Sequence, residues 1–177
     1  MIENLEDIFR KVIREELHRY NCREVKSVYL CGAIDFVSEK ETSNWRNEAT
    51  KKLNDLGIYV YDPCFASTIH NTLTIVREDL SRIKKSDVLL VNFSNENVNA
   101  CGTSMEIRQA YEWGKHIVAF VGERGIHNVP RWLKFHAVIT KHLDKAIEYI
   151  DGINHRRRVD GVNLHVDEEK EDKKDGK

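Results

Sequence analysis

The stretch "DVLLVNF", residues 87–93, decides the fold of this 177-residue chain. Four aliphatic residues follow one another in it, without the alternation that marks a strand with one face in water. Strands buried on both faces have this pattern, and they occur in parallel sheets that helices cover on both sides. The stretch therefore predicts a buried strand of a parallel α/β sheet.

Segments typical of strands and of helices alternate on either side of it. Strands are expected in "VKSVYLCGA", "IYVYDP" and "HIVAFV" and at residues 137–139. Helices are expected at residues 44–56, 73–85 and 143–150 and in "CGTSMEIRQAYEWGK", and a loop with Pro130 and Trp132 precedes the last strand. This order predicts a three-layer α/β/α domain with a mostly parallel five-stranded sheet, flavodoxin-like or Rossmann-like.

The segments that flank this domain differ from it in pattern. Apolar residues recur at helical spacing over residues 3–20, so residues 1–24 are expected to form an added amphipathic helix. The domain itself is expected to span residues 25–153. Residues 154–177 are polar and dense in charge, which favours a flexible tail.

Composition narrows the classes of function. With 28 basic and 29 acidic residues the formal net charge is −1, which gives no general attraction for nucleic acid, so small molecules are the expected partners. The four cysteines form no CxxC pair and have no zinc-ligand spacing with the histidines, so buried reduced thiols are expected rather than a metal site. No leader or membrane span is recognisable, and a cytoplasmic location is expected.

Ligands of an open parallel sheet bind beyond the carboxyl ends of its strands. That rule selects residues 29–35, 62–70, 92–106 and 122–136. Within them, the start of the helix at Gly102 and Thr103 offers free N–H groups to an anion or a sugar hydroxyl. Neither a GxGxxG motif nor a Walker loop is present, so neither a dinucleotide fold nor a nucleotide triphosphatase is predicted.

Two carboxylates have open interpretations from the residues alone. Glu106, near the start of its helix, is either a surface charge that favours a helix N-terminus or a nucleophile in the cleft. Asp79, near the middle of its helix, faces either the solvent or the site. Asp87 precedes its strand at the end away from the expected site, so a structural cap is predicted.

The motifs "VYLCGAIDF", "NWRNEATKKLNDLGIYVYDP", "REDLSRIKKSDVLLVNF" and "GTSMEIRQAYEWGKHIVAFV" together resemble the nucleoside 2-deoxyribosyltransferase superfamily, which includes the deoxynucleoside 5′-monophosphate N-glycosidases. The resemblance covers about residues 26–150. It implies cleavage of the bond between a nucleobase and 2-deoxyribose by a glutamate that attacks the anomeric carbon. No metal or cofactor is implied.

The resemblance also implies residue roles. Glu106 matches the nucleophile, Tyr29 the tyrosine that orients its carboxylate, and Asp79 the aspartate that contacts the base and transfers a proton to it. Gly32 matches the close-approach glycine after the first strand, and Asp62 and Phe65 match base-contacting positions, where Phe65 would stack on the base. Trp45 and Arg46 match a pattern at the start of the first domain helix.

The part of the site that would hold the 5′ position departs from the family pattern. Members that act on free nucleosides carry an acid six residues before the nucleophile, where this chain has Ala100 beside Asn99. The backbone and hydroxyl donors of residues 102–104 (Gly102, Thr103 and Ser104) suit a phosphate, whereas Asp35 places a negative charge in the loop after the first strand. The substrate expected is a nucleoside or nucleotide, without a choice between the free and the phosphorylated form.

The resemblance implies a homo-oligomer in which a neighbouring subunit completes the site from the loop before the last strand, with Arg131, Trp132 and His136 as candidates. Transfer to another base is weakly favoured over hydrolysis. Two alternatives remain: a nucleotide-sensing or interaction module on the same fold, and a hydrolase of a larger nucleotide such as NAD.

Overall fold

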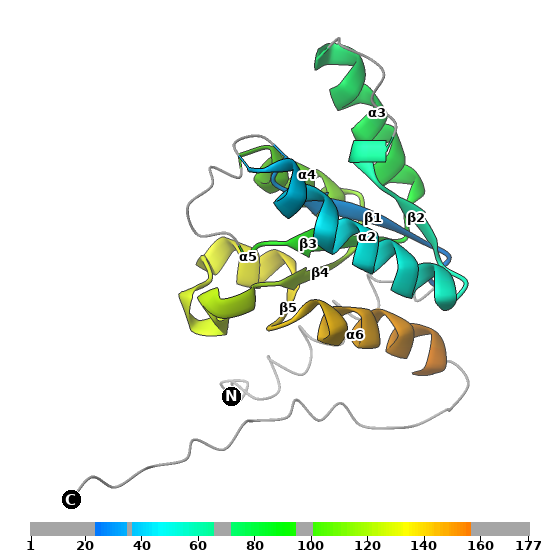
Figure 1. Ribbon diagram of the computed structural model, residues 1–177, viewed down its shortest axis with the longest axis vertical. Helices are drawn as coiled ribbons and strands as arrows, with labels where there is room; N and C mark the ends of the chain where they lie inside the picture. Colours follow the sequence, from blue (N-terminus) through cyan, green and yellow to red (C-terminus); the bar gives the residue numbers. More distant parts are fainter. Residues whose placement is uncertain (1–23, 35–36, 66–71, 95–100, 157–177) are drawn as a thin grey trace, which may run out of the picture.

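The computed structural model describes residues 24–34, 37–65, 72–94 and 101–156 (Figure 1). Its five strands are β1 (Ser27–Gly32), β2 (Tyr59–Tyr61), β3 (Val88–Asn92), β4 (His116–Phe120) and β5 (Val138–Thr140). Its helices are α2 (Glu39–Asp55), α3 (Thr72–Lys85), α4 (Cys101–Glu112), α5 (Arg131–His136) and α6 (Leu143–Arg156), with short 3-10 turns at Pro63–Phe65, Gly122–Arg124 and Ile126–Asn128. The helix expected at residues 3–20 lies outside the described residues.

The strands form one parallel sheet in the order β2-β1-β3-β4-β5. This confirms the predicted α/β/α class, and the order is that of a flavodoxin-like fold. The apolar stretch at residues 87–93 forms β3, in the middle of the sheet. Its four aliphatic residues, Val88, Leu89, Leu90 and Val91, are fully buried. The order of strands reverses direction between β1 and β3, and ligands of such sheets bind at this point.

The two faces of the sheet are covered by different helices, as Figure 1 shows. Val28 and Leu30 of β1 point to the layer of α2 and α6. Tyr29 and Cys31 point to the layer of α3, α4 and α5. The period of two along β1 therefore assigns Tyr29 and Cys31 to one face of the sheet.

Three predicted boundaries were wrong. Helix α2 begins at Glu39 rather than near residue 44, because Ser38 and Glu41 form a capping box in which each side chain accepts a hydrogen bond from the other residue's N–H. The expected loop with Pro130 and Trp132 contains α5, which buries Leu133. Helix α6 runs six residues past Ile150, to Arg156, so that residues 154–156, expected to begin the tail, are helical.

Two side chains hold the chain in place at the amino-terminal ends of the strands. The Asp87 carboxylate accepts hydrogen bonds from the N–H groups of Lys26 and Ser27 at 2.9 and 3.0 Å. The predicted structural role of Asp87 is thereby confirmed. Asn154 in α6 accepts from the Val25 N–H at 2.7 Å and donates to the Val25 carbonyl at 3.1 Å. This pair explains the extra length of α6, since its last turns hold the chain that leads into β1.

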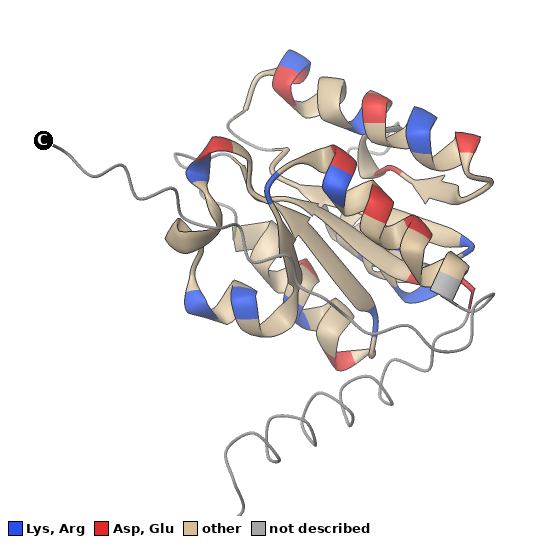
Figure 2. Cartoon of the chain, turned by 90° about the horizontal axis from the view of Figure 1, so that it is seen from below, with Lys and Arg blue, Asp and Glu red and all other residues tan. Residues whose placement is uncertain are grey.

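Charged residues lie on the helices and loops. Figure 2 shows acidic and basic residues interspersed along the outer helices, whereas the five strands contain no Lys, Arg, Asp or Glu. Across the described part of the chain, no helix combines the length and the apolar character that a membrane crossing requires.

Candidate active site

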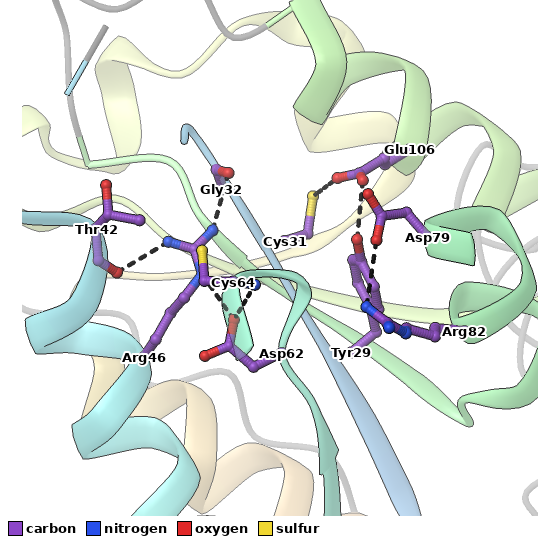
Figure 3. Close-up of polar contacts among 10 residues, drawn as sticks. All are labelled: Tyr29, Cys31, Gly32, Thr42, Arg46, Asp62, Cys64, Asp79, Arg82 and Glu106. Atoms are coloured by element: carbon purple, nitrogen blue, oxygen red, sulfur yellow. Dashed lines mark hydrogen bonds and ion pairs between the residues drawn. The ribbon is translucent and has the colours of Figure 1, made fainter. Parts of the chain in front are cut away.

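Glu106 lies in the second turn of α4, with its carboxylate directed at β1 (Figure 3). The Tyr29 hydroxyl donates a hydrogen bond to Oε1 at 3.0 Å. The Cys31 thiol donates one to Oε2 at 3.0 Å. Each oxygen of the carboxylate is therefore held by one donor, and the two donors are alternate residues of a single strand.

Asp79 of α3 lies beside this pair, as Figure 3 shows. Its side chain is 15% exposed, and Oδ1 lies 3.7 Å from Nη1 of Arg82 in the next turn of the same helix. Asp79 thus faces the site, which resolves the alternative between solvent and site. The structure brings together the three residues expected to carry the chemistry.

Burial sets the protonation of this cluster. It raises the pKa of Glu106, while the hydrogen bonds from Cys31 and Tyr29 act in the opposite direction. Burial also raises the pKa of Asp79, against the lowering effects of Arg82 and Tyr29. The charge of Asp79 raises the pKa of Glu106 further, and the charge of the neighbouring Glu78 raises that of Asp79.

The two donors keep their protons. Burial raises the pKa of the Tyr29 hydroxyl far above its usual range, and the charge of Glu106 adds to this effect. Burial and the Glu106 charge likewise raise the pKa of the fully buried Cys31 thiol. Both groups therefore remain donors across the physiological pH range.

A second polar cluster lies on the other side of β1 in Figure 3, around the buried guanidinium of Arg46. Arg46 donates to the carbonyls of Thr42 and Gly32 at 2.9 and 3.0 Å. Its Nε has no hydrogen-bond partner among the described residues but lies 3.4 Å from Oδ1 of Asp62. Asp62 forms this ion pair and accepts a hydrogen bond from the Cys64 N–H at 2.9 Å, and its contact with a base stays a prediction.

Gly32 ends β1 where backbone and side chains approach closely. A Cβ at this position would lie 3.1 Å from Cζ2 of Trp45 and 3.2 Å from Cβ of Asn92. Trp45 packs edge-to-face on Phe120, with ring centroids 5.6 Å apart. Packing is therefore a sufficient reason for the glycine and for Trp45.

A cavity of about 280 Å³ opens beside Gly32, at the carboxyl ends of β1 and β3 on the face that α2 covers. Its walls combine the rings of Trp45 and Phe120 with the polar side chains of Asn44, Asn92 and Ser94. The cavity and the Glu106 cluster flank the end of β1 on opposite faces of the sheet.

The remaining expected site residues have mixed outcomes. Thr103 is buried in the first turn of α4, and its carbonyl lies 3.9 Å from the Cys31 sulfur. Gly102 and Ser104 lie in the same turn, at the expected helix start. Asp35 and Asn99 lie outside the described residues, as does the side chain of Phe65.

The residues expected to act in a neighbouring subunit belong to α5. The Trp132 ring packs edge-to-face on Phe93 with centroids 5.9 Å apart and remains 38% exposed. Nε2 of His136 lies 3.4 Å from Nη1 of Arg108. Arg131 opens the helix.

Sequence reasoning missed two contacts of the site. Cys31 was expected only as a buried thiol, although its spacing of two residues from Tyr29 on a strand places both side chains on one face. Nothing in the sequence indicated that Arg46 is buried, because arginine is seldom fully buried in proteins. Within the described ranges, no three His, Cys, Asp or Glu side chains gather as ligands for a metal ion.

The family model described as nucleoside 2-deoxyribosyltransferase matches residues 28–172. The chain belongs to the nucleoside 2-deoxyribosyltransferase family. The match extends from β1 past the end of α6 and so includes all three residues of the Tyr29–Asp79–Glu106 cluster. No curated protein matches the chain.

Solved structures similar to this member of the family share its fold. A 2-desoxiribosyltransferase from Leishmania mexicana is 16% identical, with a TM-score of 0.58, over 72% of this chain and 97% of that one. A CMP N-glycosidase from Clostridium botulinum is 18% identical, with a TM-score of 0.52, over 71% and 98%. A conserved protein from Enterococcus faecalis is 16% identical, with a TM-score of 0.57, over 76% and 99%.

Proposed function

We propose that this protein cleaves the N-glycosidic bond of 2′-deoxynucleosides or their 5′-monophosphates through a covalent deoxyribosyl ester of Glu106. The observation that carries the proposal is the cluster of Glu106, Asp79 and Tyr29 at the ligand-binding side of the sheet in a chain of this family. Glycosidic cleavage needs an ionised carboxylate below the anomeric carbon and a protonated group near the leaving base. The cluster offers one carboxyl group for each task.

In the first step, an oxygen of the Glu106 carboxylate forms a bond to C1′ while the bond from C1′ to the base nitrogen breaks. The electron pair of that bond leaves with the base, and Asp79 supplies the proton that neutralises it. The raised pKa of Asp79 supports this role, since a general acid must hold a proton near the working pH. Tyr29 holds the Glu106 carboxylate in position through its hydrogen bond to Oε1.

In the second step, a water molecule or a second base attacks C1′ and the ester bond to Glu106 breaks. Asp79, now ionised, accepts the proton that the incoming group loses. Two displacements at one carbon return the β configuration of the substrate. We favour a second base as the acceptor, as expected from the sequence, and the same residues serve hydrolysis without change.

Substrate binding is assigned to the loops and turns around the cluster. The first turn of α4, with Gly102, Thr103 and Ser104, offers donors to the sugar or to a 5′-phosphate. Asp35 and Asn99 come after β1 and β3 in the sequence and stay proposed contacts of the substrate, since both lie outside the described residues. Cleavage of a nucleotide by the similar CMP N-glycosidase is consistent with a phosphorylated substrate but does not select one.

We further propose a homo-oligomer whose neighbouring subunit completes the site. Its support is a set of exposed apolar side chains on α4 and α5, namely Met105, Trp132 and Phe135, which are 74%, 38% and 69% exposed. Exposed aromatic and methionine side chains are enriched at protein interfaces. Light scattering on the purified protein tests this part, and a monomer at all concentrations contradicts it.

The decisive experiment combines a substrate panel with one variant. Purified protein is incubated with the four deoxynucleosides and their 5′-monophosphates, with and without a free acceptor base, and released bases are quantified by chromatography. Glu106→Gln is expected to reduce release by at least about 1,000-fold, because the nucleophile is lost. Mass spectrometry of the wild-type protein after rapid acid quench should show one added deoxyribosyl group, which is absent in the variant.

Glu112→Gln is the matched control. Glu112 belongs to the same helix, is half-exposed and pairs with Arg108. Its substitution should leave base release within about 2-fold of the wild type. Nucleotide binding by calorimetry without base release over long incubation would instead support a sensing module, and base release that persists in Glu106→Gln would exclude the proposed nucleophile.

A further inference from the structure

Among the described residues, Cys31 is the hydrogen-bond partner of the Glu106 carboxylate that the proposed reaction has not used. Its side chain is fully buried, and its sulfur lies 3.0 Å from Oε2. Cys31 follows Tyr29 by two residues on β1, so both side chains point to the same face of the sheet. The strand thus presents one donor to each oxygen of the Glu106 carboxylate. The sulfur also lies 3.9 Å from the Thr103 carbonyl oxygen, so Oε2 of Glu106 is the nearer of its two acceptors.

We propose that Cys31 is a positioning residue, which holds Oε2 of Glu106 through its thiol and favours the charged form of this carboxylate. The proposal rests on the proposed function for its kinetic part, whereas its effect on the titration of Glu106 stands on the contact alone. Cys31 does not touch the substrate and does not act as a nucleophile in this scheme.

The surroundings of Glu106 explain why such a donor is needed. The carboxylate is largely removed from water, and the Asp79 charge on α3 opposes its ionisation. The groups that favour the ionised form are the Cys31 thiol and the Tyr29 hydroxyl on β1 and the Arg46 guanidinium on α2. Arg82 of α3 pairs with Asp79 and so moderates the opposing charge. Removing one donor from this small set shifts the balance toward the protonated and non-nucleophilic acid.

The choice of a thiol also has a chemical consequence. A hydroxyl donor binds a carboxylate more tightly than a thiol does, because the S–H group is a weak donor. Oε2 is therefore held in place with less loss of electron density than Oε1. Oε2 is therefore the more nucleophilic of the two oxygens in the proposed attack on C1′.

Two substitutions distinguish a donor from a space-filling residue. Cys31→Ala removes the donor, and Cys31→Ser replaces it with a stronger one of similar size. Val91→Ala is the matched control, because Val91 pairs with Cys31 in the sheet register and belongs to the same buried layer. All three variants change the core next to Glu106, but only Cys31→Ala deletes a hydrogen bond to it.

The first measurement needs no enzymatic activity. Carboxyl titration is followed by infrared difference spectroscopy, with Glu106→Gln used to assign the Glu106 band. Cys31→Ala is expected to move the Glu106 titration to higher pH, Cys31→Ser to leave it in place or move it to lower pH, and Val91→Ala to leave it in place. An unchanged titration in Cys31→Ala, or an equal upward shift in Cys31→Ser, overturns the proposal.

The second measurement is the pH dependence of kcat/KM for base release. The acid limb of Cys31→Ala should move to higher pH in parallel with the titration, with a roughly 2- to 10-fold loss of kcat/KM on that limb, as expected for one hydrogen bond. Cys31→Ser should restore the wild-type limb. If the titration shifts and no variant or wild-type protein releases a base, the proposed function fails while the role of Cys31 in holding Glu106 stands.

A third measurement protects the test against a poorly folded Cys31→Ala protein. The S–H stretching band of Cys31, assigned by its loss in Cys31→Ser, reports the thiol hydrogen bond in the wild-type protein. In Glu106→Gln this band should move toward the frequency of a weakly bonded thiol. A band that is identical in both proteins shows that the thiol does not bond to the carboxylate and overturns the proposal.

Discussion

The hydroxyl of Tyr29 and the carboxylate of Glu106, 77 residues apart in the chain, are joined by a hydrogen bond of 3.0 Å between β1 and α4. Tyr29 is fully buried in the sheet, so its ring cannot follow a moving carboxylate. The position of Glu106 is therefore fixed by the packing of a strand, which holds a reactive group more accurately than a loop does.

Asp79→Asn should slow the release of bases that need a proton by about 100- to 10,000-fold, the range expected for the loss of a general acid. Release of 7-methylguanine from 7-methyl-2′-deoxyguanosine should fall far less, because this base already carries a positive charge and leaves without a proton. The ratio of the two rates, measured by chromatography, is the readout. Glu78→Gln is the control, since Glu78 is the neighbouring residue and pairs with Arg82. An equal loss on both substrates contradicts the assignment of the acid.

Tyr29→Phe should move both limbs of the pH profile of kcat/KM to higher pH. In the proposed reaction Glu106 must be ionised and Asp79 protonated, and the Tyr29 hydroxyl lowers the pKa of both. Its loss raises both pKa values, whereas Cys31→Ala is expected to move the acid limb alone. The maximal rate should fall about 10- to 100-fold because a hydrogen bond to a charged group is lost. A profile that keeps its position refutes this account of Tyr29.

Glu106→Gln should make the stability of the protein less dependent on pH. Burial raises the pKa of Glu106 in the folded protein, so the unfolded chain releases this proton at a lower pH than the folded protein does. Stability therefore falls as pH rises from the unfolded value through the folded one, and neutral glutamine avoids that loss. Between about pH 4 and pH 7 the wild type should therefore lose free energy of unfolding relative to Glu106→Gln, on the order of 1 kcal/mol. Urea denaturation at both pH values measures it, with Glu112→Gln as the unchanged control.

Arg46→Met should lower the free energy of unfolding by about 3 to 5 kcal/mol, since it leaves Asp62 without its cation in a buried setting. Arg46→Lys should recover only part of the loss, because one ammonium group cannot reproduce the guanidinium fork that reaches two carbonyls. Arg108→Met, at an exposed pair with Glu112, should change stability by less than about 1 kcal/mol. Urea denaturation of the three variants provides the comparison, and an Arg46→Met protein as stable as Arg108→Met would show that the buried pair contributes little.

The fold was predictable because it depends on local pattern. The apolar run of β3 and the alternation around it specify a covered parallel sheet. The start of α2 was placed wrongly although a local signal was present, since Ser38 and Glu41 have the spacing of a capping box. The end of α6 was not readable, because it depends on the contact of Asn154 with Val25, 129 residues away.

The three residues proposed to carry the chemistry could be predicted from the sequence, whereas the residues that contact and position them could not all be predicted. The matches of Tyr29, Asp79 and Glu106 to a family pattern identified the groups that the fold brings together. Asp62 was expected near a base, and its ion pair with Arg46 depends on the burial of a charge that no local pattern indicates. The contact of Cys31 with Glu106 could have been predicted, because residues two places apart on a strand point to the same face and Cys31 follows Tyr29 by two.

The pairing of Asn154 with Val25 brings the two ends of the domain together at the amino-terminal edge of the sheet, whereas the carboxylate of Glu106 serves the opposite edge. Two hydrogen bonds thus fasten the segment that enters β1 to the last turns of α6. Loss of the Asn154 side chain would release both segments at once, whereas the contacts of Glu106 with Tyr29 and Cys31 depend on other residues.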